Sequence, residues 1–244
     1  MRSTLNLRAL ALCGLLLGLM AFTAGTAQAE PNSHLWTVNP ETGLLKDLSV
    51  IILAKLDKKI PLTLTSKIAG VSVVFTCTEL ELTGAKSEAN GTISKGAKVI
   101  FTGCTTKLNG ATSAACEPVS GGKKGVVVTK PGHALIRLDI LKGPPEVKHD
   151  VIEVLPDEGE IFATIEMGEE CSIGEKVNVI GPRVQYRDCE NEFLVHKVEH
   201  LVEILLQELW VISKTAEHVA TLGGSFMLYL GGEHLNLKWS IEPA

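Results

Sequence analysis

The segment His196-Lys197-Val198-Glu199-His200 comes nearest to a known catalytic pattern in this chain. It matches the inverted zinc-protease pattern H-x-x-E-H. On a helix, two histidines at positions i and i+4 point the same way and can share one Zn²⁺, and the glutamate can then act on bound water. A catalytic zinc also needs a third protein ligand, for which Glu233 and His234 are candidates by residue type. The competing interpretation, which we prefer for so short a pattern, is a solvated helix face.

Of the six cysteines, Cys13 lies in the N-terminal apolar segment discussed below, and five remain: Cys77, Cys104, Cys116, Cys171 and Cys189. These five predict a structural role, because cysteines of exported proteins are usually bridged. The sequence leaves the pairing open. We expect Cys104–Cys116, which closes a loop of about 13 residues and stabilises by about 3 kcal/mol in the chain-entropy model, together with Cys77–Cys171. The rival pairs are Cys77–Cys104 and Cys171–Cys189. An unpaired Cys189 could form an intermolecular disulfide.

Two weaker candidates concern ligands. Trp36, Trp210 and Trp239 could each stack on a sugar, although single tryptophans more often anchor a core. The acidic run Asp157-Glu158-Gly159-Glu160 could bind Ca²⁺, but it lacks the loop spacing of an EF-hand and is better explained as a solvated turn. We therefore expect no catalytic residue, no metal and no cofactor.

The first 29 residues indicate where the rest of the chain works. Arg2 and Arg8 provide a positive start, Ala9 to Phe22 is uncharged and apolar, and Ala27-Gln28-Ala29 has small residues where a signal peptidase cuts. This pattern predicts a signal peptide that is cleaved after Ala29. We expect a protein that is secreted or held in the cell envelope and has no membrane span after cleavage.

Composition narrows the class of protein further. Hydrophobic residues make up 45% of the chain, which is too many for a disordered protein. Loss of the leader removes two arginines and no acid, so the formal net charge of −5 falls to about −7. The sequence has no basic stripe, which argues against a nucleic-acid partner. Residues 30–244 have a length that suits one domain.

The middle of the chain has the pattern of short strands. Apolar and polar residues alternate in Ile60–Thr65 and in Leu80–Thr83, as expected for strands with one buried face. Turn signals such as Asn109-Gly110 and Gly121-Gly122 separate these runs. The pattern predicts a mainly-β fold, an antiparallel sandwich or barrel.

The C-terminal third has a different pattern. Glu190 to Ala220 contains neither Gly nor Pro, and its Leu and Val residues recur at spacings of three and four. This predicts one helix over residues 193–212, with the histidines opposite the apolar stripe. A final hairpin is expected from Ser225–Leu230 and Leu235–Ile241 around Gly231-Gly232.

The middle of the chain contains a set of short elements: Phe75-Thr76-Cys77, Phe101-Thr102-Gly103-Cys104, Cys116, Pro156 with Gly159 and Phe162, Cys171, and Val179-Ile180-Gly181-Pro182. Together they resemble a group of uncharacterised secreted bacterial β-rich proteins with an F-T-G-C motif. The resemblance covers roughly residues 70–182 and implies an exported β-rich domain with two disulfide bridges, but no activity.

These observations together favour an exported, non-catalytic β-domain with a binding or surface-structural role and an extracellular ligand or surface component as partner. Rigid sheets that present loops suit that role. The alternatives are a secreted zinc hydrolase that uses His196, Glu199 and His200, and a carbohydrate-binding module.

Overall fold

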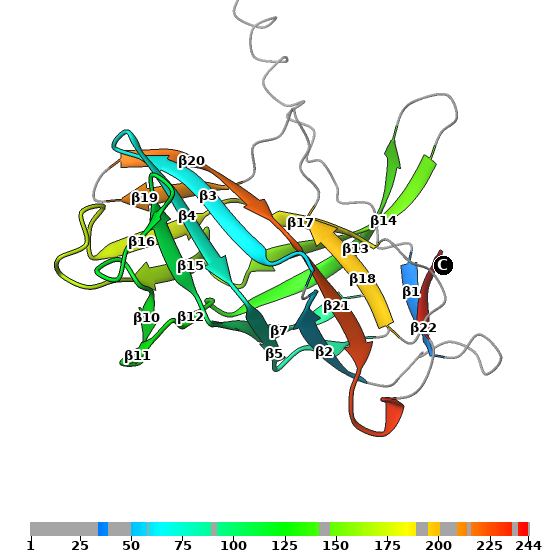
Figure 1. Ribbon diagram of the computed structural model, residues 1–244. Helices are drawn as coiled ribbons and strands as arrows, with labels where there is room; N and C mark the ends of the chain where they lie inside the picture. Colours follow the sequence, from blue (N-terminus) through cyan, green and yellow to red (C-terminus); the bar gives the residue numbers. More distant parts are fainter. Residues whose placement is uncertain are drawn as a thin grey trace, which may run out of the picture. The chain divides into compact units, whose positions relative to one another are not determined.

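A computed structural model describes residues 34–38, 50–57, 59–88, 92–141, 147–188, 195–200, 209–213, 216–235 and 239–243. These residues are mostly in β-strands, with a single 3-10 turn, η1 (Gly232–His234), among them. Every strand pairing in this part of the chain is antiparallel (Figure 1). The predicted mainly-β, antiparallel fold class is therefore confirmed. The predicted signal peptide, residues 1–29, lies outside the described residues.

The first of two large sheets contains both N-terminal and C-terminal segments of the chain. Strands β3 and β4 follow each other in sequence, whereas their neighbour β20 comes from near the end of the chain. Its strands, in spatial order, are β11 (Lys123–Lys124), β10 (Val119–Ser120), β15 (Ile161–Glu166), β16 (Lys176–Ile180), β19 (Trp210–Ser213), β20 (Ala216–Gly223), β3 (Leu62–Ile68), β4 (Val71–Cys77), β8 (Thr105–Leu108) and β9 (Ala111–Thr112).

The second large sheet closes on itself, because β7 pairs both with β13 and with the short strand β6. Strand β5 (Glu79–Thr83) lies beside β7 off this path. The strands in order are β12 (Val127–Val128), β7 (Thr92–Thr102), β13 (Gly132–Leu141), β14 (Val147–Pro156), β17 (Val184–Asp188), β18 (Val195–His200), β21 (Ser225–Leu230), β2 (Val50–Leu56) and β6 (Lys86–Ser87).

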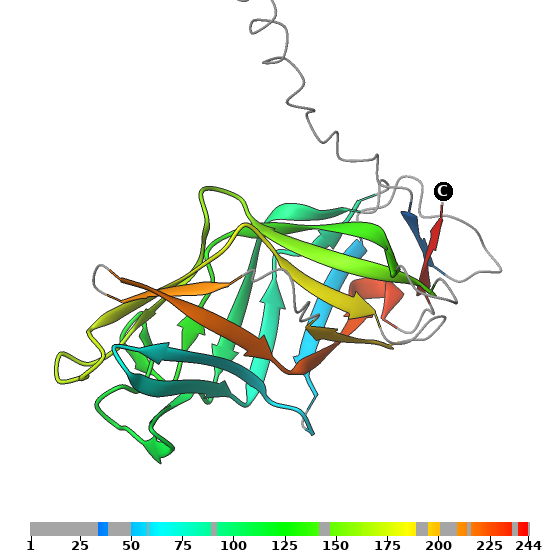
Figure 2. The ribbon, with the colours of Figure 1, turned by 90° about the horizontal axis from the view of Figure 1, so that it is seen from above.

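The chain passes from one sheet to the other at sharp corners. Strand β20 of the first sheet continues into β21 of the second through Gly224, and Figure 2 shows this path from above in orange and red-orange. Gly224 has φ +125°, and a Cβ there would lie 2.8 Å from Leu62 Cα and from the Pro61 carbonyl oxygen. Glycine is needed here because any side chain would collide with backbone.

The segment Val127 to Lys130 joins the sheets at a second place. Val127 and Val128 pair with β7, and the Thr129 amide donates to the Val99 carbonyl at 3.0 Å. On its other side, Thr129 forms a bridge with Ala163 of β15, and the Lys130 amide donates to the Phe162 carbonyl at 2.7 Å. The segment is therefore fixed by backbone hydrogen bonds to both sheets.

Two hydrophobic clusters form the core. One is built mainly from the first sheet and contains Val73, Phe75 and Val177, and the other from the second sheet and contains Ile52 and Leu230. Val154 and Tyr186 pack against both clusters. The two clusters are therefore contiguous, and residues Asn32–Ala244 form one compact unit.

A small third sheet and the C-terminal strands correct two predictions. The helix expected over residues 193–212 is wrong at both ends, because Val195–His200 is strand β18 and Trp210–Ser213 is strand β19; residues 201–208 lie outside the described part. The final hairpin is also wrong. Strand β21 pairs with β2 and β18, whereas β22 (Trp239–Pro243) pairs with β1 (His34–Val38).

Candidate functional site

The zinc motif lies on a strand. Strand β18 carries His196 and His200 between β17 and β21, with Tyr186 opposite His200 and Leu228 opposite His196. Four residues along a strand span about 13 Å, against about 6 Å along a helix. One Zn²⁺ with ligand bonds of about 2.1 Å needs the shorter spacing. The helical basis of the zinc hypothesis is therefore wrong.

The described residues also lack a metal-binding cluster elsewhere. Among them, no three His, Cys, Asp or Glu side chains lie close enough together to hold a metal ion. Glu233 is exposed, in η1, and His234 next to it is half-buried.

Two disulfides connect the four cysteines named above, in a pairing that differs from the expected one. The bridges are Cys77–Cys104 and Cys116–Cys171, with Cα–Cα distances of 4.0 and 4.7 Å. The pairing follows from the sheet: β4 ends at Cys77 and pairs with β8, which begins directly after Cys104. Cys189 and its expected role lie outside the described residues.

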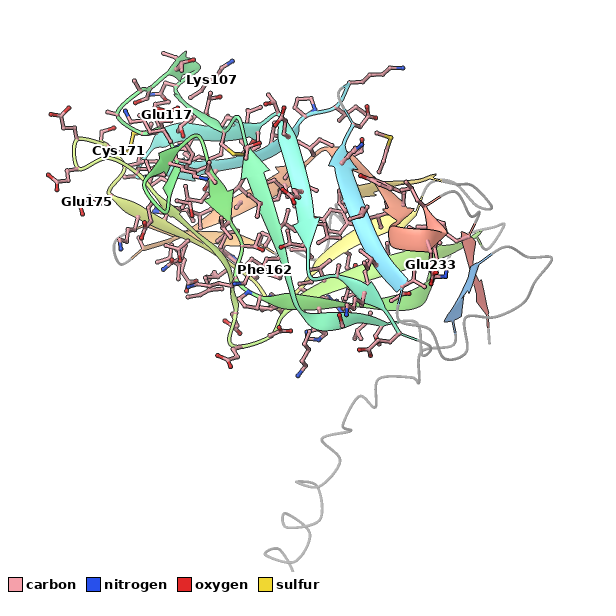
Figure 3. The ribbon with its side chains drawn as sticks, turned by 90° about the horizontal axis from the view of Figure 1, so that it is seen from below. Lys107, Glu117, Phe162, Cys171, Glu175 and Glu233 are labelled. Atoms are coloured by element: carbon pink, nitrogen blue, oxygen red, sulfur yellow. A yellow bond between two sulfur atoms is a disulfide. The ribbon has the colours of Figure 1, made fainter. Side chains whose placement is uncertain are left out.

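All four bridged cysteines are buried within the first hydrophobic cluster. Figure 3 shows Cys171 at the same end as Glu117, and Phe162 between this end and the end that carries Glu233. Both bridges therefore stabilise the first cluster, and the described residues of the second cluster include no cystine.

The tryptophan and acidic candidates have structural surroundings. Trp239 is buried in the second cluster, so its ring is not accessible for stacking on a sugar. Trp210 is half-buried on β19. The Trp36 side chain lies outside the described part. Of the acidic run, Asp157 accepts a hydrogen bond from His133, and Glu158 and Glu160 are exposed.

A cavity of about 210 Å³ is the most distinctive concave feature of the described residues, and strands of both sheets line it. Leu64, Phe75 and Ile165 come from the first sheet, and Ile152 and Leu228 from the second. Protein interiors are normally packed without voids larger than a water molecule, and an apolar cavity of this size stays dry and accepts apolar ligands. This cavity is our candidate functional site.

Polar side chains occur in only a few places in the cavity wall. Four lining residues carry a side-chain nitrogen or oxygen: Thr129, Lys130, His133 and Tyr186. Lys130 is exposed and belongs to the segment that joins the two sheets, so this part of the lining adjoins the surface. We call residues 129–133 the rim.

Burial keeps the fourth polar lining residue, Tyr186, in its protonated form. Tyr186 packs edge-on against Phe226, with ring centroids 4.9 Å apart. Desolvation by burial raises the pKa of Tyr186 well above its usual value, so the phenol stays neutral.

No family model, no curated protein and no solved structure matches this chain. The described residues contain no helix long and apolar enough to cross a membrane. Sequence reasoning missed the cavity because its lining residues are scattered from Ala54 to Leu228. Each of them looks like an ordinary core residue in its own strand.

Proposed function

We propose that this chain is an exported, non-catalytic binding protein that takes a small apolar molecule into the cavity between its two sheets. The observation that carries this proposal is the cavity itself: about 210 Å³ of space with a mostly apolar lining, which adjoins the surface at the rim. Ligand sites are typically concave and mostly apolar, with a few placed polar groups.

The disulfides support the export part of the proposal. Cys77–Cys104 and Cys116–Cys171 are both intramolecular and buried. Such bridges form and persist in oxidising compartments and are rare in the cytosol. They agree with a chain that works outside the cytoplasm after loss of its first 29 residues.

The test uses 7-azaindole, a small neutral dye whose fluorescence emission shifts to shorter wavelength in apolar surroundings. We expect saturable binding of one dye per chain, displaced by 1-octanol, and a rise in melting temperature on saturation, because a ligand that binds only the folded state stabilises it. A dye signal that never saturates, or the absence of any signal, would overturn the proposal.

Cavity-filling variants locate the dye. Ala54 and Ala163 are buried and line the cavity, so Ala54→Leu with Ala163→Leu reduces its volume. We expect at least a ten-fold loss of dye affinity. Ala111→Leu is the matched control, since Ala111 is exposed on β9, a strand that contributes no residue to the lining. If the double variant bound the dye as tightly as the unchanged protein, the dye would bind elsewhere and the proposal would be contradicted.

A further inference from the structure

The ligand's polar group can be inferred from the rim, provided that the proposed binding function holds. Three of the four polar lining residues, Thr129, Lys130 and His133, lie within five consecutive positions. The rest of the wall is apolar apart from the neutral Tyr186. A ligand that fits this distribution has an apolar tail inside and a single polar head at the rim.

Thr129 does not select the charge of the head, because it is uncharged: its hydroxyl accepts a hydrogen bond from the Val99 amide at 2.9 Å and can still donate one to either a neutral or an anionic group. The lining side chains that carry or can gain charge are therefore Lys130 and His133. Both are cationic when protonated, and neither is an acid. An anionic head is favoured over a cationic one.

His133 is held in a fixed orientation by its neighbour. Its Nδ1 lies 2.8 Å from Asp157 Oδ1, and the other Asp157 oxygen accepts the Gly96 amide at 2.7 Å. Both oxygens of this carboxylate are thus engaged, and the Asp157 amide donates to the Pro131 carbonyl at 3.0 Å. Within the described residues, Nε2 of His133 has no partner, so it is the nitrogen that can meet a ligand. Because Nδ1–H already donates to Asp157, Nε2 donates to an anionic head only in the imidazolium form, which carries a proton on both nitrogens.

The cavity volume sets the length of the tail. An apolar cavity of about 150 Å³ is known to hold the six carbons of benzene. By proportion, 210 Å³ holds a tail of about eight carbons.

We infer that the ligand is a medium-chain carboxylate, with its tail in the cavity and its carboxylate at Lys130 and at Nε2 of His133. Lys130 is exposed, and its amide is fixed to Phe162 of β15. Its long side chain can therefore follow the head, while His133 supplies the oriented contact.

The experiment compares three probes with the same tail at neutral pH: octanoate, 1-octanol and octylammonium, each by displacement of the dye. We expect octanoate to bind about ten-fold more tightly than octylammonium and more tightly than 1-octanol, because charge-assisted hydrogen bonds are about twice as strong as neutral ones.

Variants assign this preference to the rim. Lys130→Gln should weaken the binding of octanoate about five-fold and leave the affinity for 1-octanol unchanged. The double variant with His133→Gln should bind octanoate no more tightly than 1-octanol. The matched control is Lys124→Gln, which removes an exposed lysine on β11. It should change neither affinity.

The outcomes separate the two proposals. Saturable binding with equal affinity for octanoate and 1-octanol, or with a preference for octylammonium, would overturn the carboxylate inference and keep the binding function. If none of the three probes displaces the dye and the dye itself does not saturate, both proposals are wrong.

Discussion

Ala69 is one of two described non-glycine residues with positive φ, at +49°. It forms the tight turn between β3 and β4 together with Gly70, whose φ is +86°. A left-handed conformation costs an L-residue with a Cβ about 1 to 2 kcal/mol, and Asn tolerates it better than Ala. The other such residue, Asn109, shows the preferred choice.

We predict that Ala69→Asn raises the free energy of unfolding by about 0.5 kcal/mol, as measured by urea denaturation. Ala69 is exposed, so the change disturbs no packing. Ala111→Asn, at an exposed strand position without positive φ, should give no gain. A loss of stability in Ala69→Asn would show that the turn has a different conformation.

A buried ion pair lies on the face of β14 opposite the cavity. Glu153 is 1% exposed, and its Oε1 accepts a hydrogen bond from Arg183 Nη1 at 2.9 Å. Ile152 and Val154, its sequence neighbours, line the cavity, so Glu153 points the other way.

Removal of the Arg183 guanidinium takes a charged partner away from the buried carboxylate of Glu153. We predict that Arg183→Met lowers the unfolding free energy by about 2 kcal/mol. Glu153→Leu in the same chain should recover most of that loss. Equal stability of Arg183→Met and the unchanged protein, in the same urea titration, would contradict this account of the pair.

At the scale of elements, the disulfides join segments that the sequence keeps apart. The separations are 27 residues for Cys77–Cys104 and 55 for Cys116–Cys171. In the chain-entropy model, loops of these lengths contribute about 3.5 and 4 kcal/mol.

We predict that peptide mass spectrometry without reduction finds Cys77 linked to Cys104 and Cys116 linked to Cys171. Serine in place of Cys116 and Cys171 should destabilise slightly more than serine in place of the other pair, because its loop is longer. A peptide that links Cys104 to Cys116 would contradict the fold around β8.

The close approach of backbone at Gly224, between β20 and β21, can be tested directly. Gly224→Ala should cost about 3 kcal/mol, because the methyl group collides with backbone and the positive φ is strained. Gly70→Ala is the matched control: its φ is also positive, but nothing lies within 4 Å of the added Cβ. It should cost about 1 kcal/mol. Equal losses in thermal unfolding would mean that no collision occurs.

The sequence predicts some elements well and others poorly. Leu62, Leu64 and Ile68 alternate with polar residues and are buried as the pattern requires. By contrast, the spacing of Val and Leu around β18 is also compatible with a helix. This segment forms a strand because it pairs with β17 and β21. Long-range pairing of this kind leaves no local signal.

The candidate site could not be predicted for the same reason. Lys130 and His133 are separated in sequence from Ile152, Leu64 and Leu228, and only the joining of two sheets brings them around one cavity. The cysteines could be assigned a structural role, but their partners depend on which strands are neighbours.

For the whole molecule, strands that pass between the sheets predict cooperative unfolding. Trp210 lies on β19 of the first sheet, and Trp239 is buried in the second cluster. We consider one variant that keeps only Trp210 and one that keeps only Trp239, each with the other two of the three tryptophans replaced by Phe. Within each variant, tryptophan fluorescence and far-ultraviolet circular dichroism should give the same urea midpoint, as expected for two-state unfolding. Separated midpoints would show that the two halves unfold independently.

The first sheet ends in two very short strands, β9 and β11, of two residues each, and β11 consists of the exposed Lys123 and Lys124. A sheet edge offers unpaired amides and carbonyls on which a second chain can add a strand, and short, lysine-bearing edges discourage this. A β-rich chain with such edges thus carries its own protection against polymerising into fibrils.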